Sequence, residues 1–228
     1  MNRREMLAGT IAGSLWPWVG EVSAQAPQRQ PKPLPFDPKK LKGLSEKLLV
    51  SHHDNNYAGA FRRLGQIEME LAKITKDTPG FVVKGLKMEE LIATNSVILH
   101  EEYFGNLGGD GKASGSIQQT IARDFGSFDK WEQEFRATSA ALGGGSGWTV
   151  LNFNLRDGKL HNYIAFDHTD NVAFGRPILV NDMFEHSYHM DFGTNTGAYI
   201  DAFMQNVNWS ETNRRFEEAS KLFAAISK

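Results

Sequence analysis

Four side chains that can bind a metal ion stand out in this chain of 228 residues. Asp182 and His186 lie four positions apart in the segment NDMFEHSYHMDF, directly after the apolar run PILV. His52 lies in the middle of one predicted helix, and His100 lies in the middle of the next. Three imidazoles and one carboxylate suit an ion such as iron or manganese and leave room for a small ligand. The spacing alone leaves a second interpretation open, in which these histidines are separate core or surface residues.

The composition restricts the kind of site. The chain contains no cysteine, which excludes disulfides, thiolate metal sites and cysteine nucleophiles. Any metal ion must therefore be held by nitrogen and oxygen atoms, and the sequence has seven histidines. A hydrophobic content of 40% with 23% charged residues is typical of a soluble globular protein. The formal net charge of -2 favours neither nucleic acid nor an anionic membrane as a partner.

The first residues are expected to be an export signal. Arg3 and Arg4 precede a weakly apolar stretch, and VSA, which ends at Ala24, fits a signal-peptidase site. The apolar run is shorter than the roughly 20 residues that span a bilayer. The paired arginines resemble a twin-arginine signal, with an ordinary secretory signal or an anchor as the alternative. We predict a signal peptide over residues 1–24, a Pro-rich linker over 25–33, and a mature protein in the periplasm or outside the cell, without a membrane segment.

Hydrophobic periodicity predicts helices in the first half of the chain. Apolar residues recur at helical spacing from Leu41 to about Ile74, with one possible break, and again from Met88 to Leu107. Two long helices joined by a loop predict an antiparallel hairpin, which we assign to an N-terminal domain over residues 34–112. The segment SIQQTIARDFGSFDKWEQEFRATSAAL then predicts two shorter helices with a break near Asp124 or Ser127.

The pattern changes after GGGSG. WTVLNFNLRDGKLHNYIAF contains two apolar runs around an Asp-Gly pair, which is a strong hairpin signal. RPILV predicts a third, buried strand, and the chain then becomes helical again. The predicted fold class is therefore α+β: an N-terminal antiparallel helical hairpin, followed by a C-terminal α/β domain over residues 113–228 with a small three-stranded antiparallel sheet. Such a hairpin can bring His52 and His100 face to face, while the end of the third strand closes the site.

The chain resembles the iron/manganese superoxide dismutases from about Leu34 to Phe216. The resemblance rests on six segments in the family's order: LSEKLLVSHHDNNYAGAF, NSVILHEEYFGNL, DFGSFDKWEQEF, GSGWTVLNFN, NDMFEHSYHMDF and NVNWSETNRRF. It implies a superoxide dismutase that converts superoxide to oxygen and hydrogen peroxide, with one iron or manganese ion per subunit. It also implies a homodimer with the active sites near the interface. The alternative is a dimeric metal-binding relative whose dismutase activity is weak or lost.

Site residues follow from the resemblance position by position. The implied metal ligands are His52, His100, Asp182 and His186. Trp148 in GSGW matches the tryptophan that walls the site, and Glu185 matches a glutamate that reaches the ligand histidine of the partner subunit. His168 matches the position where some members use histidine to bond the metal-bound solvent. Ser96 stands where other members have a glutamine for this purpose, which leaves His168 as the expected donor.

The chain departs from the family around the outer part of the site. Asn56 stands where a relay histidine is usual, and Ala60 stands where a gateway tyrosine is usual. Tyr57 lies about one helical turn from Ala60 and is not expected to replace that tyrosine. Phe184 replaces a tryptophan, and His189 replaces a tyrosine. These changes spare the ligands and concern proton delivery and anion access. The retained ligands favour a dismutase, whereas Asn56 and Ala60 keep the alternative open.

Overall fold

The computed structural model describes residues 30–170 and 172–227. The predicted signal peptide, residues 1–24, and residues 25–29 of the predicted linker lie outside the described residues. From Pro31 onward the chain packs as one unit. The division of this unit into an N-terminal and a C-terminal domain stays a prediction. No helix in the described part is long and apolar enough to cross a membrane.

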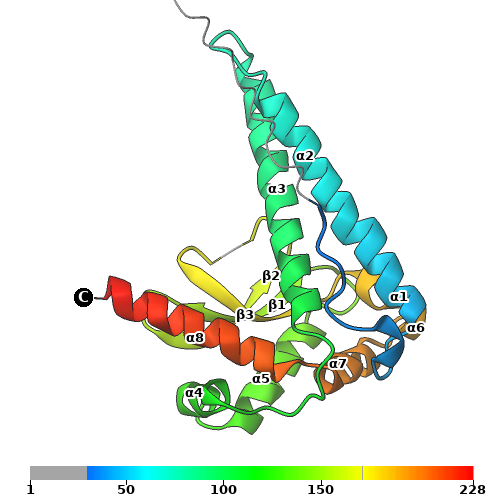
Figure 1. Ribbon diagram of the computed structural model, residues 1–228, viewed down its shortest axis with the longest axis vertical. Helices are drawn as coiled ribbons and strands as arrows, with labels where there is room; N and C mark the ends of the chain where they lie inside the picture. Colours follow the sequence, from blue (N-terminus) through cyan, green and yellow to red (C-terminus); the bar gives the residue numbers. More distant parts are fainter. Residues whose placement is uncertain (1–29, 171, 228) are drawn as a thin grey trace, which may run out of the picture. The chain divides into compact units, whose positions relative to one another are not determined.

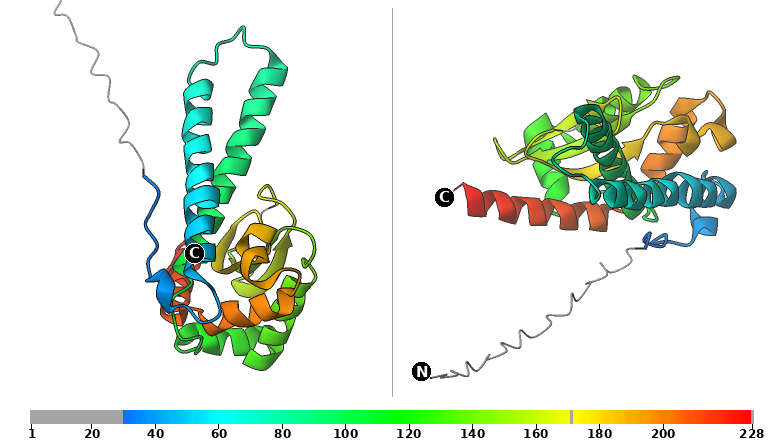
Figure 2. Two further views of the ribbon diagram at one scale, coloured as in Figure 1. Left: turned by 90° about the vertical axis from the view of Figure 1, so that its right-hand side faces the viewer. Right: turned by 90° about the horizontal axis from the view of Figure 1, so that it is seen from above.

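Two antiparallel helical segments form the hairpin that the sequence predicts (Figure 1). The first segment consists of α1 (Glu46–Ser51), a π-helix (His52–Tyr57) and α2 (Ala58–Leu71). The second is α3 (Gly80–Gly105), which begins earlier than the predicted start at Met88. Two glycines near the N-terminus of α3 weaken the helical signal in the sequence. α2 and α3 pack against each other in the hairpin (Figure 2), and the buried side chains of α3 begin at Ala93.

His52 lies at the start of the π-helix, within the segment where the sequence allows one break. The N–H of Ala58 bonds to the C=O of His53, five residues earlier, which is the pattern that defines this helix. The widened turn holds one more residue than an α-helical turn. The side chains of His52 and Tyr57 are both buried, each with 1% of its surface exposed. The π-helix thereby turns a candidate metal ligand toward the core without ending the helix.

A three-stranded antiparallel sheet follows the hairpin, in the order β2-β1-β3. Its strands are β1 (Trp148–Asn154), β2 (Lys159–Ala165) and β3 (Gly175–Asp182). A bulge between Leu151 and Asn152 shifts the register of β1 against β3. Trp148 at the start of β1 pairs with Asp182 at the end of β3. Because paired residues share a face of the sheet, the indole and the carboxylate lie beside each other. The predicted fold class is confirmed.

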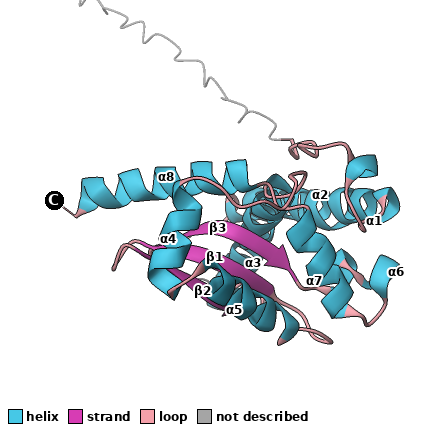
Figure 3. Cartoon of the chain, turned by 90° about the horizontal axis from the view of Figure 1, so that it is seen from below, coloured by secondary structure: helices cyan, strands magenta, loops and turns pink. Residues whose placement is uncertain are grey.

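Helices cover both faces of the sheet (Figure 3). Those outside the hairpin are α4 (Ser116–Phe125), α5 (Phe128–Ala140), α6 (His189–Phe192), α7 (Thr196–Gln205) and α8 (Trp209–Ile226). Leu99 of α3 lines a pocket together with Val150 of β1. Trp131 of α5 donates instead to Asn162 of β2, which pairs with Leu151. Since Leu151 and Val150 are neighbours on one strand, they face opposite sides, and α3 and α5 lie on opposite faces.

The break between α4 and α5 lies at Gly126 and Ser127, close to the predicted position. Gly126 has a φ of 87°, a left-handed conformation that glycine adopts without strain. The side chain of Ser127 accepts a hydrogen bond from the N–H of Lys130 and caps α5. Both signals are local, which is why the sequence predicts this boundary.

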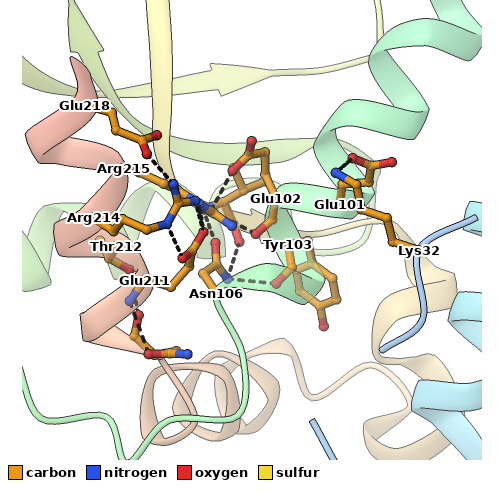
Figure 4. Close-up of polar contacts among 12 residues, drawn as sticks. Lys32, Glu101, Glu102, Tyr103, Asn106, Glu211, Thr212, Arg214, Arg215 and Glu218 are labelled. Carbon is orange, nitrogen blue, oxygen red and sulfur yellow. Dashed lines mark hydrogen bonds and ion pairs between the residues drawn. The ribbon is translucent and has the colours of Figure 1, made fainter. Parts of the chain in front are cut away.

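Two buried polar side chains tie α3 to the C-terminal half (Figure 4). Asn106, just after α3, donates to the C=O of Val180 and accepts from its N–H, so its amide pairs with β3 like a neighbouring strand. Arg215 of α8 bonds to the backbone C=O of Glu102 at 3.0 Å and to its carboxylate at 2.7 Å. Burial raises the pKa of Glu102, and Arg215 opposes this shift. These contacts hold the end of α3 that carries His100 against β3.

Candidate metal centre

Four side chains converge where the hairpin meets the sheet. They are His52 from the π-helix, His100 from α3, Asp182 from the end of β3, and His186 from the short helix η3 (Glu185–Ser187). One ligand atom from each lies within 4.8 Å of all the others. Bonds from a metal ion to nitrogen or carboxylate oxygen are about 2 Å long, so the donors around one ion lie within about 4 Å of one another. The spacing is close to that around a single ion.

His100 has one ring nitrogen occupied and one free. Its Nδ1 donates to the backbone C=O of Ser96, one turn earlier on α3, at 2.7 Å. In the neutral ring, Nε2 therefore carries a lone pair. This buried atom has no hydrogen-bond partner among the described residues. A buried polar atom without a partner destabilises the fold, and coordination of a metal ion by Nε2 removes that cost.

Asp182 is fully buried, and its two carboxylate oxygens have separate partners. Oδ1 accepts a hydrogen bond from the backbone N–H of Phe184 at 2.8 Å. Oδ2 lies 3.1 Å from Nε2 of His52 and 3.2 Å from Nε2 of His186. The hydroxyl of Tyr199 bonds to the backbone C=O of Asp182 at 2.6 Å. The carboxylate is thereby aimed at the centre of the histidine cluster.

The donor set fits iron or manganese. Nδ1 of His52 and Nε2 of His100 are buried and lack hydrogen-bond partners in the described part of the chain. Imidazole nitrogens and one carboxylate oxygen together suit these ions, and an anionic ligand stabilises the higher oxidation state. His186 is the most accessible of the four, with 27% of its side chain exposed. The cluster can therefore hold one ion and still leave a side open to a small ligand.

The protonation states also suit metal binding. Burial, followed by repulsion from His52, lowers the pKa of His100 to about 3. Burial likewise lowers the pKa of His52, although Asp182 opposes this shift. Burial raises the pKa of Asp182, but attraction to His186 and His52 outweighs it, and the pKa lies below its usual range. At neutral pH the two buried imidazoles are neutral and the carboxylate is anionic, which are the forms that bind metals.

His168 lies beside the cluster and is held in one orientation. The indole N–H of Trp148 donates to Nδ1 of His168 at 3.0 Å, and Phe184 stacks on the ring with centroids 4.8 Å apart. The side chain of Asn95 donates to the backbone C=O of His168 at 2.6 Å. Burial lowers the pKa of His168, so the ring is neutral at neutral pH. Because Nδ1 accepts a hydrogen bond, the ring proton is on Nε2.

A pocket of about 260 Å³ opens onto the cluster. Its lining includes His100, His168 and His186, and on the hairpin side it includes Asn56 and Ala60. The resemblance places a relay histidine and a gateway tyrosine at the positions of these last two residues. Alanine has no hydroxyl, and an asparagine side chain does not titrate near neutral pH. The wall of this pocket therefore lacks both of those proton-carrying groups.

Tyr57 does not replace the gateway tyrosine, as the helical register predicts. Its hydroxyl accepts a hydrogen bond from the N–H of Lys32 at 2.8 Å and donates to Glu101 at 2.9 Å. It lines a different pocket, together with Lys32 and Phe104. Burial raises the pKa of Tyr57 to about 12. The phenol therefore joins the two ligand-bearing helical segments and does not exchange protons near neutral pH.

Glu185 and His189 lie on the surface beside the cluster. Glu185 is exposed in η3, between the buried Asp182 and the buried Ser187, and His189 is exposed at the start of α6. The structure therefore brings together the predicted ligands with Trp148 and His168, but not Glu185. Its exposed carboxylate remains available to another chain.

Asn95 and Tyr199, which hold the backbone of His168 and of Asp182, are not predicted from the sequence. Asn95 is 8% exposed on α3, five positions before His100, and Tyr199 is fully buried on α7. An asparagine inside an otherwise apolar helical stretch is a signal that could have been used, because a buried amide needs partners. Tyr199 carries no comparable signal, since a tyrosine in an apolar helix is ordinary core composition.

Comparison with known proteins agrees with this geometry. Residues 113–215 match the C-terminal domain family of iron/manganese superoxide dismutases. The protein named Superoxide dismutase [Fe] of Cupriavidus metallidurans is 53% identical over 189 residues, covering 82% of this chain and 96% of that protein. Superoxide dismutase [Mn] 1 of Halobacterium salinarum is 33% identical, covering 84% of this chain and 96% of its own. Superoxide dismutase [Fe] of Aquifex aeolicus is 32% identical, covering 83% of this chain and 92% of that protein. The chain belongs to the iron/manganese superoxide dismutase family.

Proposed function

We propose that this protein is a superoxide dismutase with one iron or manganese ion held by His52, His100, Asp182 and His186. One superoxide is oxidised to oxygen, and a second takes up an electron and two protons to leave as hydrogen peroxide. The observation that carries the proposal is the set of three imidazoles and one buried carboxylate beside a small pocket. Relatives named for this activity with iron or with manganese support it.

The ligands set the electrostatics of the reaction. A bound iron or manganese ion would supply one-electron chemistry by alternating between its divalent and trivalent states. Asp182 brings a negative charge that favours the trivalent state, and its hydrogen bond from the N–H of Phe184 limits that effect. The neutral rings of His52 and His100 add no charge. The redox balance at the site is therefore controlled mainly by Asp182 and by the hydrogen bonds that it accepts.

His168 is the proposed hydrogen-bond donor in the pocket. Its Nδ1 is occupied by the indole of Trp148, so Nε2–H is the group that it can present to water or to a small anion. The ring is neutral at neutral pH and therefore donates without attracting the substrate by charge. With Asn56 and Ala60 in the pocket wall, protons for peroxide release reach the site through water. Trp148 acts as a positioning residue for His168.

Metal analysis of the purified protein, together with a dismutation assay, tests the proposal. We expect about one iron or manganese ion per chain and turnover that falls when the ion is removed with a chelator. Turnover should return when the same ion is restored. A protein that binds the ion stoichiometrically but does not consume superoxide would establish the alternative, a metal-binding relative without dismutase activity.

We further propose that the active form is a homodimer in which Glu185 bonds the ligand His186 of the second subunit. The exposed position of Glu185, next in sequence to the partly exposed His186, supports this arrangement. In a two-fold dimer the contact occurs twice and couples the metal site to assembly. Glu185→Gln should weaken dimerisation and lower activity together. Asp77→Asn, at the exposed loop of the hairpin, is the matched control. Sedimentation showing an intact, fully active Glu185→Gln dimer would exclude this role.

Export to the periplasm or beyond the cell is proposed from the N-terminal sequence alone. Arg3 and Arg4 are the residues that the twin-arginine route requires. Exchanging both for lysine should retain the precursor in the cytoplasm, whereas the general secretory route would tolerate the change. Fractionation of cells that express the two forms distinguishes the routes.

A further inference from the structure

Arg63 lines the same pocket as three histidines of the candidate site. It lies on α2, seven positions after Asn56 and three after Ala60, and all three residues contribute to the pocket wall. Residues at these spacings share one face of a helix. This face of the helical segment extends from the metal cluster toward solvent, and the guanidinium group of Arg63 lies at its solvent end. The side chain of Arg63 is 54% exposed, so its charge is accessible to an approaching anion.

Arg63 is the only lysine or arginine among the described residues that line this pocket, and no aspartate or glutamate lines it. The remaining lining groups are amides, small or apolar side chains, a serine and histidines. The guanidinium is therefore the permanently charged cationic side chain in the lining of this pocket.

Glu89 of α3 forms an ion pair with Arg63. The carboxylate is 39% exposed and does not line the pocket. Glu89 lies on the second helix of the hairpin. Its negative charge offsets part of the positive charge of Arg63. An ion pair at this degree of exposure contributes little to stability, because water and salt screen it. Its larger effect is on the field that reaches a small anion in the pocket.

We propose that Arg63 guides superoxide into the pocket and that Glu89 limits the strength of this guidance. The inference rests on the proposed dismutase function, because it takes superoxide as the anion. A positive charge near the mouth raises the local concentration of an anion and its rate of entry. For a single, partly paired charge near solvent we expect an effect of roughly twofold to fivefold at low ionic strength. The effect should fade as salt shortens the screening length.

Four variants of the metal-loaded protein test the proposal. Arg63→Gln removes the charge, Arg63→Lys keeps it, and Glu89→Gln removes the opposing carboxylate. Lys73→Gln is the matched control, because Lys73 also pairs with a glutamate but lies ten residues, or about 15 Å, further along the hairpin. The measured quantity is kcat/KM for superoxide between low and high ionic strength.

We expect kcat/KM to fall about twofold to fivefold in Arg63→Gln at low salt and to become less dependent on salt. Arg63→Lys should retain most of the rate, and Glu89→Gln should exceed the unmodified protein. Lys73→Gln should match the unmodified protein. If the ion pair only joined the two helices, Arg63→Gln and Glu89→Gln would change stability equally and leave the salt dependence of kcat/KM intact. That result would overturn the proposal.

Azide binding separates this inference from the proposed activity. Azide is a small anion whose binding to the metal-loaded protein is followed by absorbance, whether or not superoxide turns over. We expect weaker azide binding in Arg63→Gln and tighter binding in Glu89→Gln, with Lys73→Gln unchanged. Equal azide affinity in all variants would refute guidance by Arg63, while a failure of dismutation alone would refute only the proposed function.

Discussion

Trp148 on β1 lies directly opposite Asp182 on β3, so one cross-strand pair carries both a metal ligand and the indole that holds His168. The register of β1 against β3 therefore fixes the positions of Trp148, Asp182 and His168 together. A shift of β3 by one residue would turn Asp182 to the other face of the sheet, away from Trp148. A change that shifts this register should consequently alter the metal site and the pocket together.

Trp148→Phe should separate the effect on His168 in the pocket from the effect on the metal ligands. The variant loses the indole N–H and leaves Nδ1 of His168 without its donor, while most of the aromatic packing remains. A lost hydrogen bond of about 1 kcal/mol predicts a fall of roughly fivefold in kcat/KM with the metal content unchanged. Trp209→Phe is the control, because its indole N–H bonds to the C=O of Gly111, away from the site. Equal rates for the two variants would show that His168 does not depend on Trp148.

His100→Ala should remove the bound ion. The substitution deletes one of three imidazole donors and leaves the buried carboxylate of Asp182 with fewer partners. We expect metal content near zero after dialysis and no measurable dismutation. His161→Ala, at an exposed residue bonded to Asp157, should keep both. A His100→Ala protein that retains its ion would exclude this residue as a ligand.

Ala60→Tyr, alone and together with Asn56→His, should place side chains that can transfer protons in the lining of the pocket. The phenol narrows the opening and supplies a group that titrates near pH 10. We expect the reduction of superoxide, which consumes protons, to speed up more than its oxidation, and a new alkaline step to appear in the pH profile. Pulse radiolysis resolves the two half-reactions. Ala58→Val, at a buried neighbour on α2 that does not line the pocket, controls for disturbance of the helix.

The metal-free protein should lose stability in acid. The pKa values of His52 and His100 are lowered on folding, so the unfolded chain binds more protons below about pH 6.5. For His100 the free energy of unfolding should therefore fall by about 2 kcal/mol between pH 7 and pH 5, and His52 adds a loss in the same direction. The lowered pKa of Asp182 adds a further loss below about pH 4. Urea denaturation at several pH values measures this, and His100→Gln should remove the part of the loss above pH 5 that His100 contributes.

Arg215→Ala should destabilise the fold much more than Arg214→Ala. Arg215 is 8% exposed and pairs with Glu102 and Glu211, so its removal leaves the partly buried carboxylate of Glu102 without this ion pair. We expect a loss of about 3 kcal/mol or more. Arg214 pairs with Glu211 and Glu218 but is 54% exposed, and its loss should amount to less than about 1 kcal/mol. Denaturant midpoints compare the two, and equal midpoints would exclude the role of Arg215 as a buried anchor.

Much of the fold is predictable from sequence because its signals are local. The break at Ser127, the turn after β1 and the helical spacing of the hairpin each depend on a few neighbouring residues. The four-residue spacing of Asp182 and His186 after an apolar strand marks them as candidate ligands, and the family resemblance completes that assignment. These features involve short-range physics that a linear pattern records.

The rest depends on contacts that a linear pattern does not record. The π-helix at His52 requires one extra residue in a turn, which leaves the hydrophobic spacing on either side intact. The orientation of His168 depends on Trp148, twenty positions earlier, and on Asn95, which lies on α3. The helix α3 begins eight residues before the predicted Met88, although its two glycines lower the helix propensity of this part.

The sequence distance between the ligands has a consequence for how the protein acquires its ion. His52 and His186 are 134 positions apart, and four elements, the π-helix, α3, β3 and η3, must come together before all four donors meet. Closing such long loops is slow, so the complete site forms late in folding. An ion that binds the native state and not the unfolded chain stabilises that state by about 2.7 kcal/mol when its free concentration is a hundred times its dissociation constant. Any loosening of the hairpin from the sheet separates these donors, which makes retention of the ion one measure of how firmly those two parts hold together.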